Sequence, residues 1–354
     1  MSAADGPDHD SRVPAPPDGA RKPRSLVARL MRMVAALVLL GIAFGAALAL
    51  WGYHGLDAPG PLAQPTTVVI PRGEGVEAIA NRLQRAGVIR HPIVMMVAVR
   101  LTDRARGLKA GEYQFSAGIS TAEVIALLFE GRTVIRRLTV AEGLTTAQVL
   151  QILDGAEGLE GALAASPNEG ELLPETYHYS YGDSRDEMLR RMRRAAVDAV
   201  NEAWSTRDRA LPLANSREAL VLASIVEKET SREDERARIA GVFINRLRLG
   251  MSLQSDPTVI YGLSAGTGTI GRALTREDLQ APHAYNTYVH KGLPPGPICN
   301  PGRAALQAVT RPQQTDELYF VADGTGGHAF ARTLAEHNRN VQRWRRLQGQ
   351  GGSN

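Results

Sequence analysis

The first strong pattern along the chain is an apolar run over residues 33–53, MVAALVLLGIAFGAALALWGY. No charged residue occurs between Arg32 and Asp57. About 20 apolar residues in a helix are enough to cross the roughly 30 Å hydrocarbon layer of a membrane. A cleaved signal peptide is the alternative, but its apolar part is normally about 7–15 residues long. Trp51 and Tyr53 suit the membrane–water interface, so the run predicts one uncleaved transmembrane helix.

The charges that flank this run predict its orientation. Residues 20–32 contain five Lys or Arg residues and no acidic residue, and the next Lys or Arg is Arg72. The positive-inside rule therefore predicts a basic cytoplasmic tail over residues 1–32 and places residues 54–354 outside the membrane. Residues 54–66 are rich in Pro and Gly and are expected to form a linker.

Three similar units follow the linker. They begin at positions 68, 113 and 138 and read VVIPRGEGVEAIANRL, YQFSAGISTAEVIALL and LTVAEGLTTAQVLQIL. Each unit predicts a short strand, a turn at an aligned glycine (Gly73, Gly118 or Gly143) and an amphipathic helix. Strand–turn–helix units of this size resemble the LysM-like modules of cell-wall proteins, which would guide glycan. Residues 67–155 are therefore expected to be a LysM-like α+β subdomain, and a packing domain without a ligand is the alternative.

The pattern changes to longer helices in a second predicted α+β domain, residues 156–347. Amphipathic helices are predicted over residues 185–204, 216–230 and 233–249. A Gly- and Pro-rich region rich in loops follows, and the alternating segment ELYFVADGTGGHAF predicts a β-hairpin. A helix of about 14 residues from Thr333 ends this domain, and residues 348–354 are expected to be a disordered tail.

Composition excludes several classes of function. The 41 Lys and Arg residues exceed the 37 Asp and Glu residues by only four, which argues against a dedicated nucleic-acid-binding protein. The single cysteine, Cys299, excludes an intramolecular disulfide and a cysteine-rich metal site. The eight histidines form no metal-binding motif, and no Walker loop, HExxH or GxSxG motif is present, so no metal or cofactor is expected.

Candidate chemistry lies in ALVLASIVEKET, residues 219–230. The segment is apolar almost all round its predicted helix until Glu227 and Glu229 occur at the C-terminal end. Partial burial and the negative end of the helix dipole both disfavour an ionised carboxylate, so the pKa should rise. A protonated carboxylic acid near neutral pH is what glycosidic bond cleavage requires. The alternative is that the helix reaches the surface here and EKETSREDE is a solvated run.

Four segments in this order resemble the YceG-like family of endolytic murein transglycosylases (MltG-type): ASIVEKET, VFINRLRLGMSLQSDPTVIYG, APHAYNTYVHKGLPPGPICNPG and LYFVADGTGGHAF. The resemblance extends over residues 30–345, although the family usually has more aromatic residues around EGELLPETYHYS. It implies an inner-membrane lyase whose periplasmic domain cuts peptidoglycan strands internally. The β-1,4 bond between N-acetylmuramic acid and N-acetylglucosamine would be cleaved to leave a 1,6-anhydro-muramyl end, which trims or terminates nascent strands.

The resemblance also implies the site. Its catalytic acid matches Glu227, and Glu229 would make a supporting contact, although helical periodicity alone does not choose between the two. Gln254 and Asp256 in SLQSDPT, and Asn286 and Tyr288 in AYNTY, are expected to bind the sugar or to orient the acid; the alternative for these positions is turn chemistry.

Other functions stay open at this stage. Peptidoglycan synthases are expected partners by resemblance. One rival is a lysozyme-like hydrolase in which Asp256 assists a water molecule while Glu227 acts as the acid. The other is a non-catalytic scaffold that binds peptidoglycan and organises wall growth.

Overall fold

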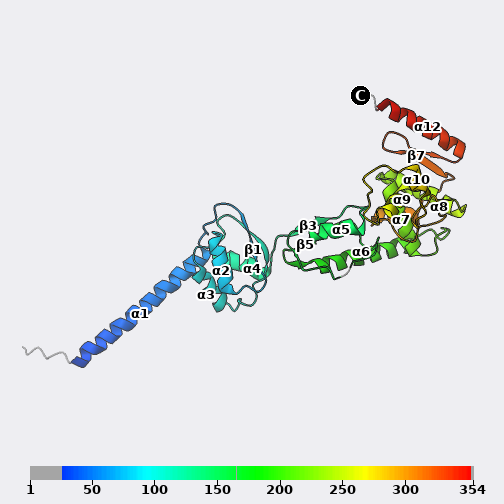
Figure 1. The fold of residues 1–354 in the computed structure, drawn as a ribbon. Coiled ribbons are helices and arrows are strands. Elements are labelled where there is room, and N and C mark those ends of the chain that lie inside the picture. The colour runs from blue at the N-terminus through cyan, green and yellow to red at the C-terminus, as the bar shows by residue number, and fades with distance from the viewer. Residues whose placement is uncertain (1–25, 165, 352–354) are drawn as a thin grey trace, which may run out of the picture.

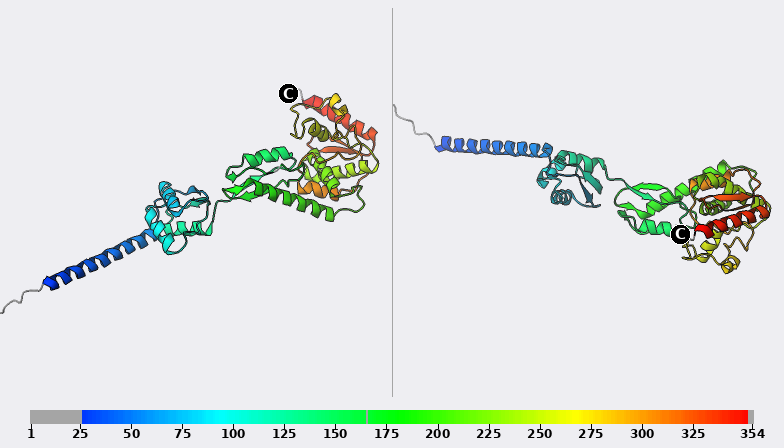
Figure 2. Two further views of the ribbon diagram at one scale, coloured as in Figure 1. Left: turned by 60° about the horizontal axis from the view of Figure 1, so that its bottom comes forward. Right: turned by 90° about the horizontal axis from the view of Figure 1, so that it is seen from above.

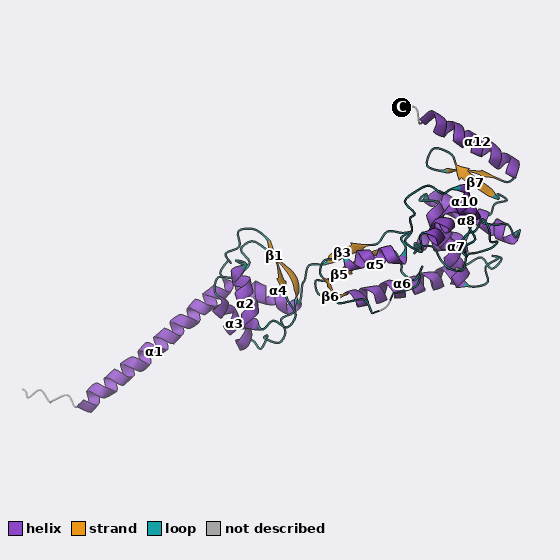
Figure 3. Ribbon diagram, viewed as in Figure 1, coloured by secondary structure: helices purple, strands orange, loops and turns teal. Residues whose placement is uncertain are grey.

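The computed structural model describes residues 26–164 and 166–351. Helices alternate with short pairs of strands, which confirms the predicted mixture of helices and strands (Figure 3). Figure 1 and the two turned views of Figure 2 show an elongated molecule, with one long helix at one end and the C-terminal hairpin and helix at the other. Three clusters of buried apolar side chains lie between these ends.

The long helix α1 (Leu26–Asp57) contains the predicted apolar run and exceeds it on both sides. None of its residues is buried, and large apolar side chains such as Leu40 and Phe44 are about two-thirds exposed. By length and composition it is the one described helix able to cross a membrane. Residues 1–25, most of the predicted basic tail, lie outside the described residues.

The first cluster, the N-terminal core, lies within a β–α–α–β–α unit. Its elements are β1 (Thr66–Ile70), α2 (Val76–Arg85), α3 (Pro92–Leu101), β2 (Gly111–Phe115) and α4 (Thr121–Glu130). β1 and β2 pair antiparallel. Leu83 of α2, Met95 of α3 and Phe115 of β2 are fully buried in this core. Of the linker expected over residues 54–66, the first four residues belong to α1, which continues to Asp57. Residues 58–65 lie between α1 and β1 in neither a helix nor a strand, and Leu62 among them packs on this core.

The third predicted strand–helix unit does not join the first two. Its strand β3 (Arg136–Thr139) pairs antiparallel with β5 (Thr176–Tyr179), beyond the expected domain boundary at residue 155. Its helix α5 (Thr146–Asp154) buries Val149 and Leu153 in a second cluster, the middle core. The first half of α6 (Arg185–Ser205) completes this core, and β4 (Leu159–Glu160) pairs with β6 (Asp183–Ser184) beside it. The likeness to LysM modules remains a prediction.

The third cluster, the C-terminal core, is mostly helical. The three predicted helices are present as α6, α7 (Ser216–Glu229) and α8 (Glu233–Arg248). The second half of α6 packs in this cluster together with α7 and α8. A helix that the sequence analysis missed, α11 (Arg303–Thr310), packs against all three. Two further short helices, α9 (Asp256–Leu263) and α10 (Arg276–Gln280), lie in the region expected to be loops.

The predicted β-hairpin is present as β7 (Tyr319–Ala322) and β8 (His328–Ala331). The helix after it, α12 (Leu334–Gly351), is 18 residues long and packs on the hairpin. The expected disordered tail is therefore wrong for residues 348–351, which extend this helix without a break; residues 352–354 lie outside the described part of the chain.

Candidate functional site

The candidate site forms where α7 ends. The Asn215 side chain accepts a hydrogen bond from the backbone of Glu218 and starts the helix, and seven apolar or small residues from Ala219 to Val226 are buried. Thr230 leaves the helical conformation, so Glu227 and Glu229 occupy the last turn. Residues two apart on a helix project about 200° apart. The two carboxyl groups therefore contact different parts of the protein.

Glu229 faces the segment before α9. Its Oε1 accepts a 2.5 Å hydrogen bond from the Ser255 hydroxyl, and its Oε2 accepts none from the described residues. Burial raises the pKa of Glu229 to about 7, with Asp256 adding to the rise, whereas the Ser255 bond and the charges of His328 and Arg246 oppose it. At neutral pH this carboxyl group is thus present in both protonated and ionised forms.

The segment that holds Ser255 is fixed on both sides. Arg246 of α8 donates from Nη1 to the Leu253 carbonyl at 2.7 Å. Thr287 accepts from the Ser255 N–H at its hydroxyl and from the Gln254 N–H at its carbonyl. Gln254 adopts a left-handed backbone (φ 53°) and its side chain is exposed. Strained non-glycine residues of this kind concentrate at functional sites.

Asp256 and Tyr288 form a pair beside Glu229. The Tyr288 hydroxyl donates to Asp256 Oδ1 at 2.5 Å. Burial and the neighbouring Asp256 carboxylate raise the pKa of Tyr288, so its proton stays in place near neutral pH. The structure therefore brings four predicted site residues together, in two segments and the end of α7: Gln254, Asp256, Tyr288 and Glu229.

Asn286 differs from its prediction. The residue is fully buried. Its amide nitrogen donates to the carbonyls of Leu279 and Ala281, and its amide oxygen accepts from the Tyr288 N–H. A sugar would have to displace these bonds, each of which is expensive to leave unmade in a buried place. Asn286 thus shapes the loop that carries Tyr288 and does not itself present a polar atom to a substrate.

Glu227 lies on the opposite side of α7. Its Oε2 accepts a 2.9 Å hydrogen bond from the Gly302 N–H at the start of α11, and its side chain is only 5% exposed. Arg236 Nη2 lies 3.6 Å from Oε1 and 3.8 Å from a Glu142 carboxylate oxygen. Burial raises the pKa of Glu227, whereas the Gly302 bond opposes the rise. None of the other predicted site residues forms a hydrogen bond or ion pair with Glu227 in the described chain.

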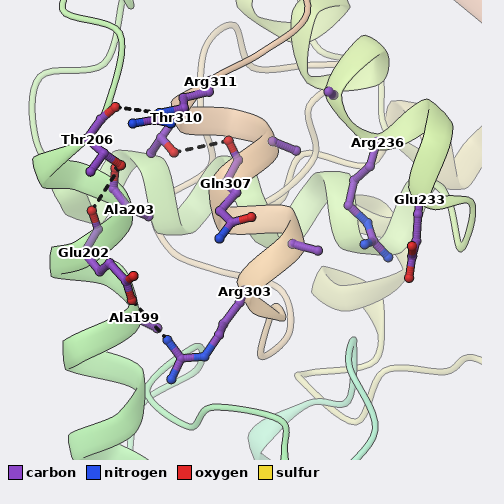
Figure 4. A pocket seen from close by; sticks show the side chains of 13 residues that line it. Ala199, Glu202, Ala203, Thr206, Glu233, Arg236, Arg303, Gln307, Thr310 and Arg311 are labelled. Atoms are coloured by element: carbon purple, nitrogen blue, oxygen red, sulfur yellow. Dashed lines mark hydrogen bonds and ion pairs between the residues drawn. The ribbon is translucent and has the colours of Figure 1, made fainter.

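Figure 4 shows a cavity that Arg236, the partner of Glu227, borders. The cavity, of about 650 Å³, lies between α6, α8 and α11, and Arg236 and Glu233 project beside it. Arg303 of α11 reaches Glu202 of α6 across it at 3.3 Å. The Arg303–Glu202 pair links α11 to α6, and Arg236 of α8 lies beside Glu227 of α7. The Glu227 carboxyl thus belongs to the supporting framework of α11.

The sequence analysis missed the residues that hold these carboxyl groups. Ser255 lies in SLQSDPT and Thr287 in AYNTY, but their sequence positions do not show that these segments contact α7. Arg236 is one of several charged residues at the start of α8, and the sequence does not distinguish it from the others. Glu142 comes from the third strand–helix unit, which was assigned to another domain. In the described ranges, 26–164 and 166–351, no group of three His, Cys, Asp or Glu side chains is arranged to hold a metal ion.

Comparison with known proteins gives the family. The sequence profile of the YceG-like family matches residues 68–343. The chain belongs to the YceG-like family. The resemblance identified from the sequence motifs is thereby confirmed, and the matched range contains both glutamates and the loops that face them.

Two named relatives and one solved structure are similar to this YceG-like chain. An endolytic murein transglycosylase of Streptococcus pneumoniae serotype 2 (strain D39 / NCTC 7466) is 29% identical over 87% of this chain. The chain spans 65% of that relative's length. An endolytic murein transglycosylase of Bacillus subtilis (strain 168) is 29% identical over 78% of this chain and 83% of its own. A crystal structure of a yceG-like protein from Listeria monocytogenes is 30% identical, with a TM-score of 0.49, over 78% of this chain and 99% of its own.

Proposed function

We propose that this chain is a membrane-anchored lytic transglycosylase that cuts peptidoglycan strands internally. The observation that carries the proposal is Glu229, a carboxyl group whose pKa is raised to about 7 and which lies beside Ser255 and the Asp256–Tyr288 pair. The printed names of the relatives, endolytic murein transglycosylases, support the substrate and the reaction class.

The reaction needs one carboxyl group. Protonated Glu229 donates its proton to the oxygen of the β-1,4 bond between N-acetylmuramic acid and N-acetylglucosamine as that bond breaks. The resulting carboxylate takes the proton of the muramic acid C6 hydroxyl, whose oxygen attacks C1 and closes the 1,6-anhydro ring. Glu229 returns to its starting state, and no water is consumed. The Ser255 hydroxyl bonds to Oε1, and in this proposal Oε2, which accepts no hydrogen bond from the described residues, carries both transfers.

The choice of Glu229 over Glu227, the residue implied by the motif, rests on two contrasts and on the pKa of Glu229. Glu229 shares its surroundings with the other predicted substrate-binding side chains, whereas Glu227 is surrounded by α11 and Arg236. Glu229 has a carboxyl oxygen without a hydrogen bond from the described residues, whereas both oxygens of Glu227 face donors. Burial raises the pKa of Glu229 to about 7. Glu227 then stabilises the start of α11.

Gln254, Asp256 and Tyr288 complete the proposed site. The exposed Gln254 side chain offers an amide donor and acceptor for an acetamido group. Asp256 repels a second negative charge and so helps to keep Glu229 protonated. Tyr288 holds Asp256 in place through its hydroxyl group.

The products of digestion test this function. The purified chain in detergent is incubated with peptidoglycan strands, and the masses of the fragments are measured by mass spectrometry. The proposal predicts anhydro ends, which lack one water relative to reducing ends. Reducing ends instead would identify the rival hydrolase, in which Asp256 assists a water molecule. Unchanged strands with retained binding would identify the non-catalytic scaffold.

The anchor is part of the same proposal. Helix α1 crosses the inner membrane with its basic N-terminal end in the cytoplasm, so the three cores lie in the periplasm, where nascent strands are made. The N-terminal core guides glycan as a LysM-like unit, and peptidoglycan synthases are partners. A reporter that is active only after export, fused after Asn354, should be active; activity of a cytoplasm-only reporter at the same point would contradict this topology.

A further inference from the structure

A second cavity, of about 670 Å³, lies on the opposite half of α7 from Glu229. We call it the tyrosine pocket, because Tyr261 of α9 and Tyr285 of the following loop line it with ring centroids 4.8 Å apart. Gly296 faces the Tyr285 hydroxyl so closely that a methyl group there would come within 2.9 Å of it. The Tyr285 side chain thus lies between Gly296 and the Tyr261 ring.

Polar groups complete the lining. The Tyr261 hydroxyl donates to Glu169 Oε2 at 3.2 Å, while Glu169 Oε1 accepts from the backbone and hydroxyl of Thr146. Burial raises the pKa of Glu169, although these bonds oppose the rise. Arg217 at the start of α7 makes one long bond of 3.4 Å, to a backbone carbonyl. The pocket therefore offers two aromatic rings, the Glu169 carboxyl group and the Arg217 guanidinium with spare donors. Glu171 and Arg193 also line it and form an ion pair with each other at 3.0 Å.

The pocket is connected to the proposed catalytic site by two short segments. Tyr261 follows Asp256 by five residues on α9, an axial rise of about 7.5 Å. Tyr285 precedes Tyr288 by three residues in one loop. Each segment thus has one end beside Glu229 and the other in the pocket. A linear polymer whose scissile bond lies at Glu229 has another of its units within reach of the two rings.

We propose that the tyrosine pocket binds a pyranose ring of the same glycan strand, away from the bond that is cut. Aromatic rings pack against the apolar C–H face of a sugar, while carboxyl and guanidinium groups bond to its hydroxyl and acetamido groups. Small-molecule sites combine such apolar walls with a few placed polar groups. The inference rests on the proposed function, because it gives that function a second contact with the strand. Binding here favours internal cutting, since a strand end that stops short of the pocket loses the contact.

Binding of a linear N-acetylglucosamine oligosaccharide to the full chain in detergent, measured by calorimetry, tests the pocket without any cleavage. Tyr285→Ala should weaken binding about tenfold, because a stacked ring is lost. Tyr285→Phe keeps the ring and should bind like the unchanged chain. Tyr181→Ala is the matched control, because Tyr181 packs near Gly158 in the middle part of the molecule. Arg217→Ala, at the start of α7, should also weaken binding and serves if Tyr285→Ala fails to fold.

The outcomes separate this inference from the proposed function. Equal binding by folded Tyr285→Ala, Arg217→Ala and the unchanged chain would overturn the inference, even if cleavage produces anhydro ends. Binding of an isolated stem peptide in place of the oligosaccharide would also overturn it. Weaker binding by both variants supports the pocket even if Glu229→Gln still cuts strands. In cleavage assays, Tyr285→Ala should raise KM for long strands.

Discussion

Replacing Glu229 with glutamine tests the proposed acid and the physical origin of its pKa together. The substituted side chain keeps the shape of the original and an oxygen that accepts from Ser255, but it carries no acidic proton to transfer. General acid catalysis contributes roughly 100- to 10,000-fold in rate, so strand cleavage by Glu229→Gln should fall by at least about 100-fold. In the unchanged enzyme, cleavage should also decline as the pH rises above 7, because the protonated form of Glu229 is lost.

The same substitution should stabilise the fold at high pH. The pKa of Glu229 rises from the usual 4.5 to about 7, so between these values the folded chain keeps a proton that the unfolded chain releases. The free energy of unfolding therefore decreases as the pH rises through this window, by about 3 kcal/mol at 1.36 kcal/mol per pH unit. Glu229→Gln avoids this loss. Its gain over the unchanged chain should be about 3 kcal/mol above pH 7 and vanish below pH 4.5.

Melting curves at pH 5 and pH 8, recorded together with cleavage rates, measure both effects. Glu227→Gln is the matched control on the same helix turn. Its amide oxygen still accepts from the Gly302 N–H, so cleavage should stay within about tenfold of the unchanged rate. If Glu227→Gln abolishes cleavage with an unchanged melt while Glu229→Gln remains active, the acid is Glu227. If Glu229→Gln gains no stability at pH 8, burial does not raise the pKa of Glu229.

Three further predictions concern the surroundings of the site. Ser255→Ala removes a hydrogen bond that lowers the pKa of Glu229, so the alkaline limb of the pH–rate profile should move to higher pH; a shift to lower pH would contradict the assigned role. A chain truncated to residues 132–354 should fold, whereas 156–354 should not, because it leaves β5 unpaired; circular dichroism and melting curves decide this. Gly170→Ala places a methyl group 2.7 Å from a proline ring carbon at φ +81° and should lower the free energy of unfolding by about 1–3 kcal/mol, measured in urea; no change would mean that the loop relaxes freely.

Local patterns predicted the elements that local forces decide. Helix α7 follows from an apolar run with a cap, and the β7–β8 hairpin follows from alternation around glycines. The partner of β3 was not predictable in this way, because β5 lies almost 40 residues further along and pairing between distant segments leaves no local pattern. Helix α11 was also missed, since its eight residues make barely two turns between Pro301 and Pro312, too few for periodicity alone to establish a helix.

For the candidate site, too, local features could be predicted from the sequence and tertiary contacts could not. The apolar helix that ends in two glutamates was evident from the sequence, and so was their placement on opposite sides. Which glutamate meets Asp256 and Tyr288 depends on where the loops at Ser255 and Thr287 pack, and that is set by tertiary contacts of Arg246 and Asn286. The burial of Asn286 could likewise not be predicted from the sequence, because an asparagine in a loop can face solvent or bond to the backbone and the sequence does not distinguish these two cases.

Helix α1 is longer than a membrane crossing requires. Its 32 residues measure about 48 Å, whereas the hydrocarbon layer is about 30 Å thick. Near its C-terminal end, Trp51 contacts His91, just before α3, with ring centroids 5.1 Å apart, and Leu56 packs into the N-terminal core. The anchor and the first domain thus form one rigid piece without a flexible tether. With α1 in a bilayer, as proposed, the N-terminal core is held at the membrane surface, and the middle core lies between it and the helices around Glu229 (Figure 1). A strand that is still attached to the membrane would then be cut beyond these two cores.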